Sequence, residues 1–178
     1  VQAILDARQA NGPFQSLDAF CQQVDLRLVG KRPLECLIKV GALGDFGERA
    51  QLLDGLDQIV NASTSHFRAA EAGQLSFFGG AASSFTSVQL GAAKSELTRR
   101  EILSWEKELI GLYVSDHPLQ PVMGELQLHV TDYSQMLTED DHGRGVIMAG
   151  VVTNLRPYFT KKGDAMGFVS VEDLQGHL

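Results

Sequence analysis

The first sixty residues are divided by glycine and proline into helix-length segments, and this punctuation allows only short helices packed against one another. Asn11-Gly12-Pro13 combines a glycine suited to a helix C-cap with a helix breaker. Ser16 is a favourable N-cap for the apolar residues that follow it, and helices this short need tertiary packing to persist. Helices are therefore expected over residues 1–10, from Ser16 to about Val24, from Pro33 as the first helical residue to Gly41, and over residues 48–60.

The composition changes at Asn61. Between residues 61 and 93 the only charged residues are Arg68 and Glu71, and alanine, glycine and serine are abundant. Residues 79–84 carry too few apolar side chains to form a core. We therefore predict a flexible linker over residues 61–94, with room for a short helix over residues 66–72.

Ordered structure is predicted to return at Thr98. Thr98 and Glu101 match a capping box, and Leu97 with Ile102 matches the accompanying hydrophobic staple. The helix is expected to end near residues 115–118. Its predicted apolar face comprises Ile102, Trp105, Leu109 and Leu112 or Tyr113.

The last part of the chain contains two apolar, β-branched runs. Residues 145–155 and 166–171 flank a turn at Lys161-Lys162-Gly163-Asp164, which predicts a β-hairpin. Because two strands alone are marginally stable in water, we expect the sheet to continue beyond Leu178. Helices followed by an antiparallel sheet make the expected fold class α+β.

The chain carries a net charge of −7, but its charges are segregated. An acidic total argues against a protein whose whole surface grips nucleic acid, and acidic residues gather over 125–141. No apolar run approaches the length of a membrane span, and the N-terminus lacks the layout of a secretory signal. We expect a cytoplasmic chain without a membrane partner, whose two ends look cut. The basic clusters are Arg27, Lys31, Arg32 and Lys39, then Arg156, Lys161 and Lys162.

Cysteine, histidine and acidic residues are not spaced as in a catalytic or metal site. Cys21 and Cys36 lie fifteen residues apart without zinc-ligand spacing, so both are predicted to be buried core residues. Residues 139–141 are acidic but are predicted to form a solvated loop, and His117 is predicted to cap or pack at a helix end. The sequence contains no P-loop, HExxH or GxSxG motif. No catalytic residue, metal or cofactor is expected in this region.

The pentapeptide Gln74-Leu75-Ser76-Phe77-Phe78 is unusual within its bland surroundings. Its amide can hydrogen-bond at the rim of a pocket, while Leu75, Phe77 and Phe78 supply apolar area. Burial of three such side chains yields several kcal/mol before ordering costs, consistent with micromolar binding to a partner. The residues alone leave open the alternative that Phe77 and Phe78 fold back on neighbouring helices.

Several segments, in order along the chain, resemble the bacterial DNA polymerase III alpha subunit family. The pentapeptide is similar to the sliding-clamp-binding motif, with Phe77 where leucine is usual. Residues 11–42 resemble the helix-hairpin-helix region, Trp105 to Gly111 with Ser115 to Leu119 resembles the segment after the clamp motif, and residues 149–174 resemble the opening strands of an oligonucleotide-binding (OB) fold. Each match is modest, but together they span the chain.

The resemblance implies two DNA-binding surfaces. In a helix-hairpin-helix, backbone N–H groups at the turn hold a phosphate beside basic side chains. In an OB fold, single-stranded DNA follows a basic groove and stacks on aromatic rings. Phe168 is the first candidate for a core position instead, and a merely solvated basic surface stays open for both clusters. The implied contacts are Arg27, Lys31, Arg32 and Lys39 for duplex DNA, and Arg156, Tyr158, Phe159, Lys161 and Lys162 for single-stranded DNA.

The resemblance also implies an organisation and a role. The family is the catalytic chain of a replicative polymerase, whose active-site aspartates and Mg²⁺ are expected upstream, so this fragment should bind and tether without polymerising. The implied partners are the sliding clamp (beta subunit), duplex and single-stranded DNA, and other holoenzyme subunits. A non-catalytic clamp-binding or DNA-repair adaptor, or a structural fragment that binds nothing, are the alternatives. The expected parts are a helix-hairpin-helix region (1–60), a linker with the clamp motif (61–94), a helical connector (95–130) and an incomplete OB-fold barrel (131–178).

Overall fold

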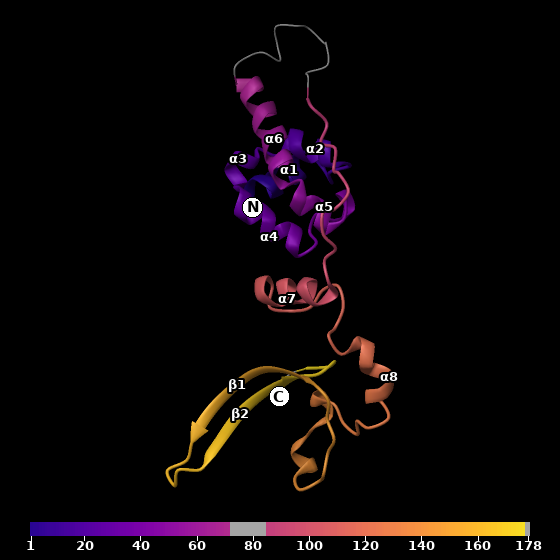
Figure 1. Cartoon of the computed structure of the whole chain (residues 1–178), viewed down its shortest axis with the longest axis vertical. Coiled ribbons are helices and arrows are strands. Elements are labelled where there is room, and N and C mark those ends of the chain that lie inside the picture. The colour runs from indigo at the N-terminus through magenta and orange to yellow at the C-terminus, as the bar shows by residue number, and fades with distance from the viewer. Residues whose placement is uncertain (72–84, 177–178) are drawn as a thin grey trace. The chain divides into compact units, whose positions relative to one another are not determined.

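The computed structural model describes residues 1–71 and 85–176, and the chain divides into two compact units, Val1–Leu112 and Tyr113–Leu178. The first unit is helical, and the second contains a two-stranded antiparallel sheet (Figure 1). The predicted α+β class is therefore confirmed. Within the described ranges, no helix has both the length and the apolar character needed to cross a bilayer.

From α1 to α6 the elements follow one another with short connections, as the glycine and proline punctuation of the first sixty residues predicts. In the first unit they are α1 (Gln2–Asn11), α2 (Leu17–Gln23), α3 (Leu26–Val29), α4 (Lys31–Lys39), α5 (Arg49–Asp54), α6 (Leu56–Glu71) and α7 (Arg99–Leu109). In the second unit they are α8 (Met123–Leu126), β1 (Val151–Phe159) and β2 (Ala165–Glu172). Short 3₁₀ turns lie at Gly44–Phe46, Gln120–Val122, Ser134–Met136 and Glu139–Asp141.

The core of the first unit forms around α2, as its apolar spacing predicts. Ser16 caps this helix by accepting a hydrogen bond from the N–H of Ala19 at 3.1 Å. Phe20 is fully buried and contacts two other rings, Phe14 edge-on at 5.2 Å between centroids and Phe46 at 5.9 Å. The other buried residues of this core are Leu17, Cys21, Val24, Leu26, Val29, Leu34, Ile38, Leu43, Leu52, Leu56 and Ile59.

Several helix boundaries differ from the predictions, and α7 ends at Leu109 instead of near residues 115–118. Helix α4 begins at Lys31, so Pro33 is its third residue rather than its first, because Gly30 with φ 83° turns the chain directly into the helix. The predicted helix over 48–60 is broken at Gly55, and α6 continues to Glu71, past the composition change at Asn61. A Cβ atom on Gly55 would lie 2.7 Å from the side chain of Leu90, which explains the glycine at this break.

Residues 85–94, which we call the return segment, pack against the helical unit although a linker is predicted there. Phe85, Val88 and Leu90 lie against the core. The backbone N–H of Lys94 donates to the Asp54 carboxylate at 2.7 Å. These three apolar side chains are few and widely spaced, so their partial burial depends on the core that the helices provide.

Helix α7 has the predicted start but a different buried face. Thr98 and Glu101 form the expected capping box, with a 2.8 Å bond from the Thr98 N–H to the Glu101 carboxylate. However, the buried residues are Leu103 and Glu106, whereas the predicted face leaves Leu109 exposed. The reason is that Glu106, with a fully buried side chain, pairs with Arg49 of α5 at 2.9 Å. Hydrophobic spacing alone could not place a buried carboxylate on the packed side.

The second unit confirms the predicted hairpin and shows how its base is held. Strands β1 and β2 form a long antiparallel ribbon (Figure 1). At the end of β2 the buried Asp173 accepts hydrogen bonds from the N–H groups of Ser134, Gln175 and Gly176 at 2.5, 2.7 and 2.8 Å. Burial alone would raise the pKa of Asp173, but these bonds and the Ser134 hydroxyl together hold that pKa below its ordinary value.

Candidate nucleic-acid interface

The turn between α3 and α4 is the candidate phosphate-binding site in the first unit. Gly30 has a positive φ that L side chains rarely adopt, and its N–H donates to the carbonyl of Leu26 at 2.9 Å. The next helix starts immediately with Lys31 and Arg32, and no side chain among the described residues caps it. Two cationic residues thus occupy the first turn of α4, where the helix dipole is also positive.

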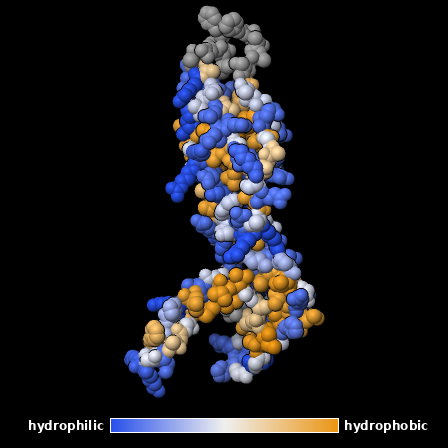
Figure 2. Space-filling view, in the orientation of Figure 1, coloured by the Kyte–Doolittle hydropathy of each residue, from blue (hydrophilic) through white to orange (hydrophobic). Residues whose placement is uncertain are grey.

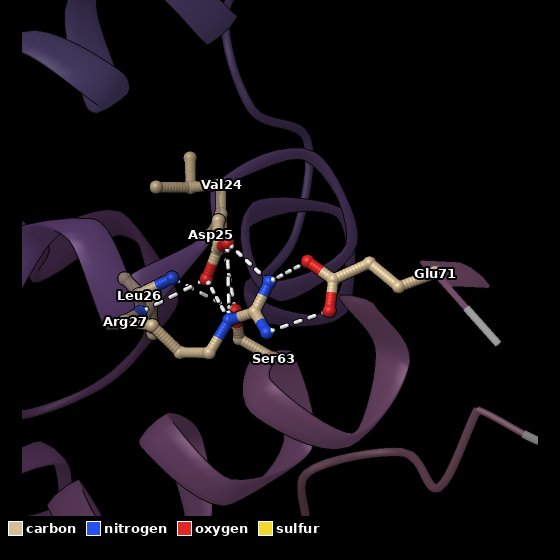
Figure 3. Close-up of polar contacts among 6 residues, drawn as sticks. All are labelled: Val24, Asp25, Leu26, Arg27, Ser63 and Glu71. Carbon is tan, nitrogen blue, oxygen red and sulfur yellow. Dashed lines mark hydrogen bonds and ion pairs between the residues drawn. The ribbon is translucent and has the colours of Figure 1, made fainter. Parts of the chain in front are cut away.

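The backbone at the start of α3 is fastened to α6 by a buried serine (Figure 3). The Ser63 hydroxyl donates to the carbonyl of Val24 at 2.7 Å and accepts from the N–H of Leu26 at 3.1 Å. Ser63 is fully buried, so this pair of bonds is shielded from water. A four-residue helix has little stability of its own, and Ser63 supplies part of the support that holds the turn in place.

Arg27 lies between two carboxylates in the same cluster (Figure 3). Its guanidinium donates to Asp25 at 2.7 Å and to Glu71, at the end of α6, at 2.6 and 3.0 Å. Hydrogen bonds from Arg27 lower the pKa values of both carboxyl groups, and those carboxylates raise the pKa of Arg27. The sequence did not predict this bridge, because Glu71 lies 44 residues away from Arg27.

The other predicted duplex contacts occupy different environments. Lys31 pairs with Asp57 at 2.6 Å, with both side chains largely exposed. Lys39 pairs with Glu35 at 2.6 Å and lies 5.2 Å from the centre of the Trp105 ring. Arg32 is exposed and has no ion pair within residues 1–71 and 85–176. Lys31 and Arg32 therefore lie at the turn, while Lys39 lies at the far end of α4.

The hairpin register separates the aromatic residues of β1 and β2 onto two faces. Pairing of Arg156 with Phe168 and of Tyr158 with Met166 puts these four side chains on one face, which we call the even face. Rings of Tyr158 and Phe168 lie 6.0 Å apart, consistent with this placement. Phe168, the first candidate for a core position, is 57% exposed in the described hairpin.

The opposite face of the hairpin, which we call the odd face, is apolar. Leu155 pairs with Val169, and Phe159 pairs with Ala165. A Cβ atom on Gly167 would lie 3.3 Å from the Leu155 side chain, as expected when both share one face. Phe159 is 71% exposed, and Figure 2 shows hydrophobic residues gathered on the surface of the second unit. Phe159 is therefore separated from Tyr158, although the two are adjacent in the sequence.

Lys161 and Lys162 occupy the hairpin tip. The N–H of Thr160 donates to the carbonyl of Asp164 at 2.9 Å, and Gly163 with φ 89° completes the reversal. Both lysines are exposed, and neither they nor Arg156 forms an ion pair in the part of the chain that the structure describes. The β1–β2 hairpin thus carries two exposed lysines at its tip and an arginine, Arg156, beside two aromatic rings.

Three further sequence predictions concern the clamp motif, a metal site and the cysteines. The clamp motif, Gln74-Leu75-Ser76-Phe77-Phe78, lies outside the described residues. Among the residues that are described, no three His, Cys, Asp or Glu side chains come together as a metal site. Cys21 is buried as predicted, whereas Cys36 is only half-buried, contrary to its prediction. Burial, and then the charge of Asp18, raises the pKa of the Cys21 thiol to about 12. Its sulfur donates to the carbonyl of Ile59 at 3.7 Å.

Comparisons with known proteins concern the first unit and the chain as a whole. The profile of the helix-hairpin-helix motif matches residues 1–52, which include the Gly30 turn. DNA polymerase III subunit alpha from Pseudomonas aeruginosa is 34% identical over the whole of this chain, and that from Pasteurella multocida is 32% identical. The chain is homologous to one region of DNA polymerase III alpha subunits. The Escherichia coli subunit is 29% identical, and the chain spans about 16% of the length of each of these relatives.

The helix-hairpin-helix match covers α1 to α4 and part of α5, so the elements that form the Gly30 turn all lie within the matched residues.

The two faces of the β1–β2 hairpin could have been predicted from the sequence. Leu155, Pro157 and Phe159 alternate with Asn154, Arg156 and Tyr158, which is the pattern of one apolar and one mixed face.

Proposed function

We propose that this chain is the DNA-holding and clamp-tethering region of a replicative DNA polymerase. The observation that carries the proposal is the similarity of its whole length to alpha subunits of DNA polymerase III. DNA-directed DNA synthesis with Mg²⁺ would then belong to the complete polymerase, in association with other replication subunits. The role proposed for this region is binding. Duplex DNA would bind at the Gly30 turn, single-stranded DNA on the hairpin, and a sliding clamp at residues 74–78.

The Gly30 turn suits a duplex phosphate for electrostatic reasons. Lys31 and Arg32 at the start of α4 add positive charge to the positive end of the helix dipole. That arrangement is unfavourable for an isolated helix and favourable once an anion binds there. Lys31 can exchange its exposed partner Asp57 for a phosphate at small cost, since exposed ion pairs contribute little. Phosphate contacts of this type position the protein without reading the base sequence.

The even face of the hairpin suits a single strand. Tyr158 and Phe168 offer aromatic surfaces for bases, and Arg156 with the tip lysines offers cations for the backbone. An edge-to-face pair leaves part of each ring open for a stacked base. The odd face lacks cationic residues from Leu155 to Phe159 and from Ala165 to Val169, so it suits packing rather than DNA.

The separation of faces predicts different effects for two phenylalanines of the hairpin. Replacing Phe168 with alanine should weaken binding of a single-stranded oligonucleotide by about 1–3 kcal/mol, the usual contribution of one stacked base. Phe159→Ala is the matched control, because the same side chain is removed from the odd face. Fluorescence anisotropy with a labelled oligothymidylate measures both. Equal losses from the two variants would contradict the assignment of the even face.

The lysines at the hairpin tip should control the salt dependence of the same binding reaction. Each contact between a lysine and a phosphate of a single strand contributes to the slope of log affinity against log salt, and loss of two such contacts reduces its steepness by about 1.4. We therefore expect Lys161→Gln/Lys162→Gln to flatten the slope by this amount. Lys107→Gln with Lys94→Gln removes the same charge from the first unit and should leave the slope as it is. A slope unchanged in the tip variant would show that these lysines do not contact DNA.

A further inference from the structure

We propose that a pocket between α6 and the return segment binds an uncharged peptide in an extended conformation. The pocket has a volume of about 530 Å³, which is in the range of ligand-binding sites. Among the described residues that line it there is no Asp, Glu, Lys or Arg, so the pocket suits a ligand without charge. None of these lining residues belongs to the proposed DNA or clamp sites, and binding at the pocket can therefore be tested independently.

The return segment lies beside α6 as an extended chain (Figure 1). At one end the Phe85 ring contacts His66, with the ring centroids 5.8 Å apart. At the other end the Leu90 side chain lies against Gly55, directly before α6. The helical rise between these two contacts is about 16 Å, a distance that the five residues from Phe85 to Leu90 cover when they are nearly extended. One wall of the pocket is thus a helix, and the other is an extended backbone.

The extended wall offers hydrogen-bonding groups of its backbone. The N–H of Val88 donates to the Asp18 carboxylate at 2.9 Å. Successive N–H groups of an extended chain point to opposite sides, so those of Ser87 and Gln89 point away from Asp18. Both residues line the pocket, and their N–H groups form no hydrogen bond within residues 1–71 and 85–176. A second extended chain can therefore pair with this edge, as a peptide does when it adds a strand.

The helical wall adds side chains that bond well to peptide groups. Gln58, Asn61 and Ser65 line the pocket, are exposed, and follow one another at intervals that form a row on one face of α6. A side-chain amide both donates and accepts hydrogen bonds, as a peptide group does. The row spans about 10 Å, the length of roughly three extended residues. Phe85 and Val88 supply apolar surface in the same pocket for an aliphatic side chain.

A nucleobase fits this pocket less well than a peptide. Side-chain amides also read base edges, and an aromatic ring can stack on a base. However, no cationic side chain among the described lining residues is available for the attached phosphates, and the Phe85 ring stands perpendicular to His66 and packs partly against the core. The backbone edge at Ser87 and Gln89 is complementary to another backbone, and this favours the peptide.

The test titrates the 178-residue chain into a dye-labelled probe peptide, Ser-Val-Gln-Val-Ser-amide, and follows fluorescence anisotropy. We expect saturable binding. Two further probes are N-methylated, one at both valines and the other at the glutamine and the last serine. Only one of these two sets of N–H groups can face the edge at Ser87 and Gln89, so one analogue should bind at least ten-fold more weakly than the probe.

Variants of the helical wall locate the binding site. Asn61→Ala and Gln58→Ala each remove an exposed amide from the pocket and should weaken probe binding about five-fold, the usual effect of one hydrogen bond. Gln9→Ala is the matched control, because it removes an exposed amide from α1, outside the pocket. All three variants should keep the unfolding curve of the parent, and Gln58→Ala decides if Asn61→Ala alters it.

Several outcomes would overturn the peptide site. Absence of saturable binding at millimolar concentrations would do so, as would two N-methylated analogues that both bind as tightly as the probe. Equal losses in the pocket variants and in Gln9→Ala would place the probe elsewhere on the chain. Adenosine or thymidine that binds more tightly than the probe, and loses affinity in Asn61→Ala, would assign the pocket to a nucleobase instead.

Discussion

Replacing Phe77 and Phe78 with alanine is expected to abolish detectable binding of this chain to a purified sliding clamp. Each phenylalanine side chain can bury 150 Å² or more, so at about 25 cal/mol per Å² the pair supplies several kcal/mol. Every 1.4 kcal/mol corresponds to a tenfold change in the dissociation constant. Loss of about 4 kcal/mol would move a micromolar complex to the millimolar range, which surface plasmon resonance would register as no binding.

A matched control makes the clamp experiment specific. Phe159 is exposed in the second unit and outside the clamp motif, so Phe159→Ala removes the same kind of side chain and should bind the clamp as the parent does. The double variant should also keep the unfolding curve of the parent, since binding rather than folding is at issue. Parent-like clamp affinity in the double variant would refute the tether, whatever the DNA measurements show.

The second large effect is expected from Arg49, which holds α7 to the rest of the first unit. Its guanidinium donates to the buried Glu106 carboxylate at 2.9 Å and to the carbonyl of Lys39 at 3.2 Å. A Cβ atom on Gly41 would lie 2.5 Å from this guanidinium, so the side chain occupies a tightly bounded place. Removing one partner of a buried ion pair costs about 3–5 kcal/mol, and Arg49→Met should lower the free energy of unfolding by roughly 3 kcal/mol.

Urea unfolding followed by the fluorescence of Trp105 measures this loss, because this tryptophan lies on α7. Lys31→Met is the control: it also removes one cation from an ion pair, but the Lys31 and Asp57 side chains are largely exposed. Such pairs contribute less than about 1 kcal/mol, so the control should unfold near the parent midpoint. Equal destabilisation by the two variants would mean that burial of Glu106 does not matter.

Local chemistry explains why much of the helical unit was predictable. Gly12 and Ser16 act through their own backbone and nearest neighbours, and the structure shows the expected helix end and N-cap at these positions. The capping box at Thr98 and the turn of the hairpin follow for the same reason. Such signals depend on residues three or four apart, and distant packing does not alter them.

The contacts that sequence analysis missed are those between residues distant in the sequence. Helix α7 turns Glu106 inward because it pairs with Arg49, 57 residues earlier. Arg27, for which a DNA contact is predicted, forms an ion pair with Glu71, 44 residues later. The pairing register places Phe168, the first candidate for a core position, opposite Arg156. In each case the partner lies in another element of the chain, so local spacing could not indicate it.

The sequence by itself determined the α+β class, the short helices, the hairpin and the resemblance to polymerase alpha subunits, because these depend on local spacing and on the order of motifs. Tertiary structure alone decided which charged residues are engaged and which are available. Arg27 and Arg49 are held by carboxylates, while Arg32, Arg156 and the tip lysines remain accessible. The physical reason is that an ion pair requires two charges within about 4 Å, a distance that folding sets between residues far apart in the chain.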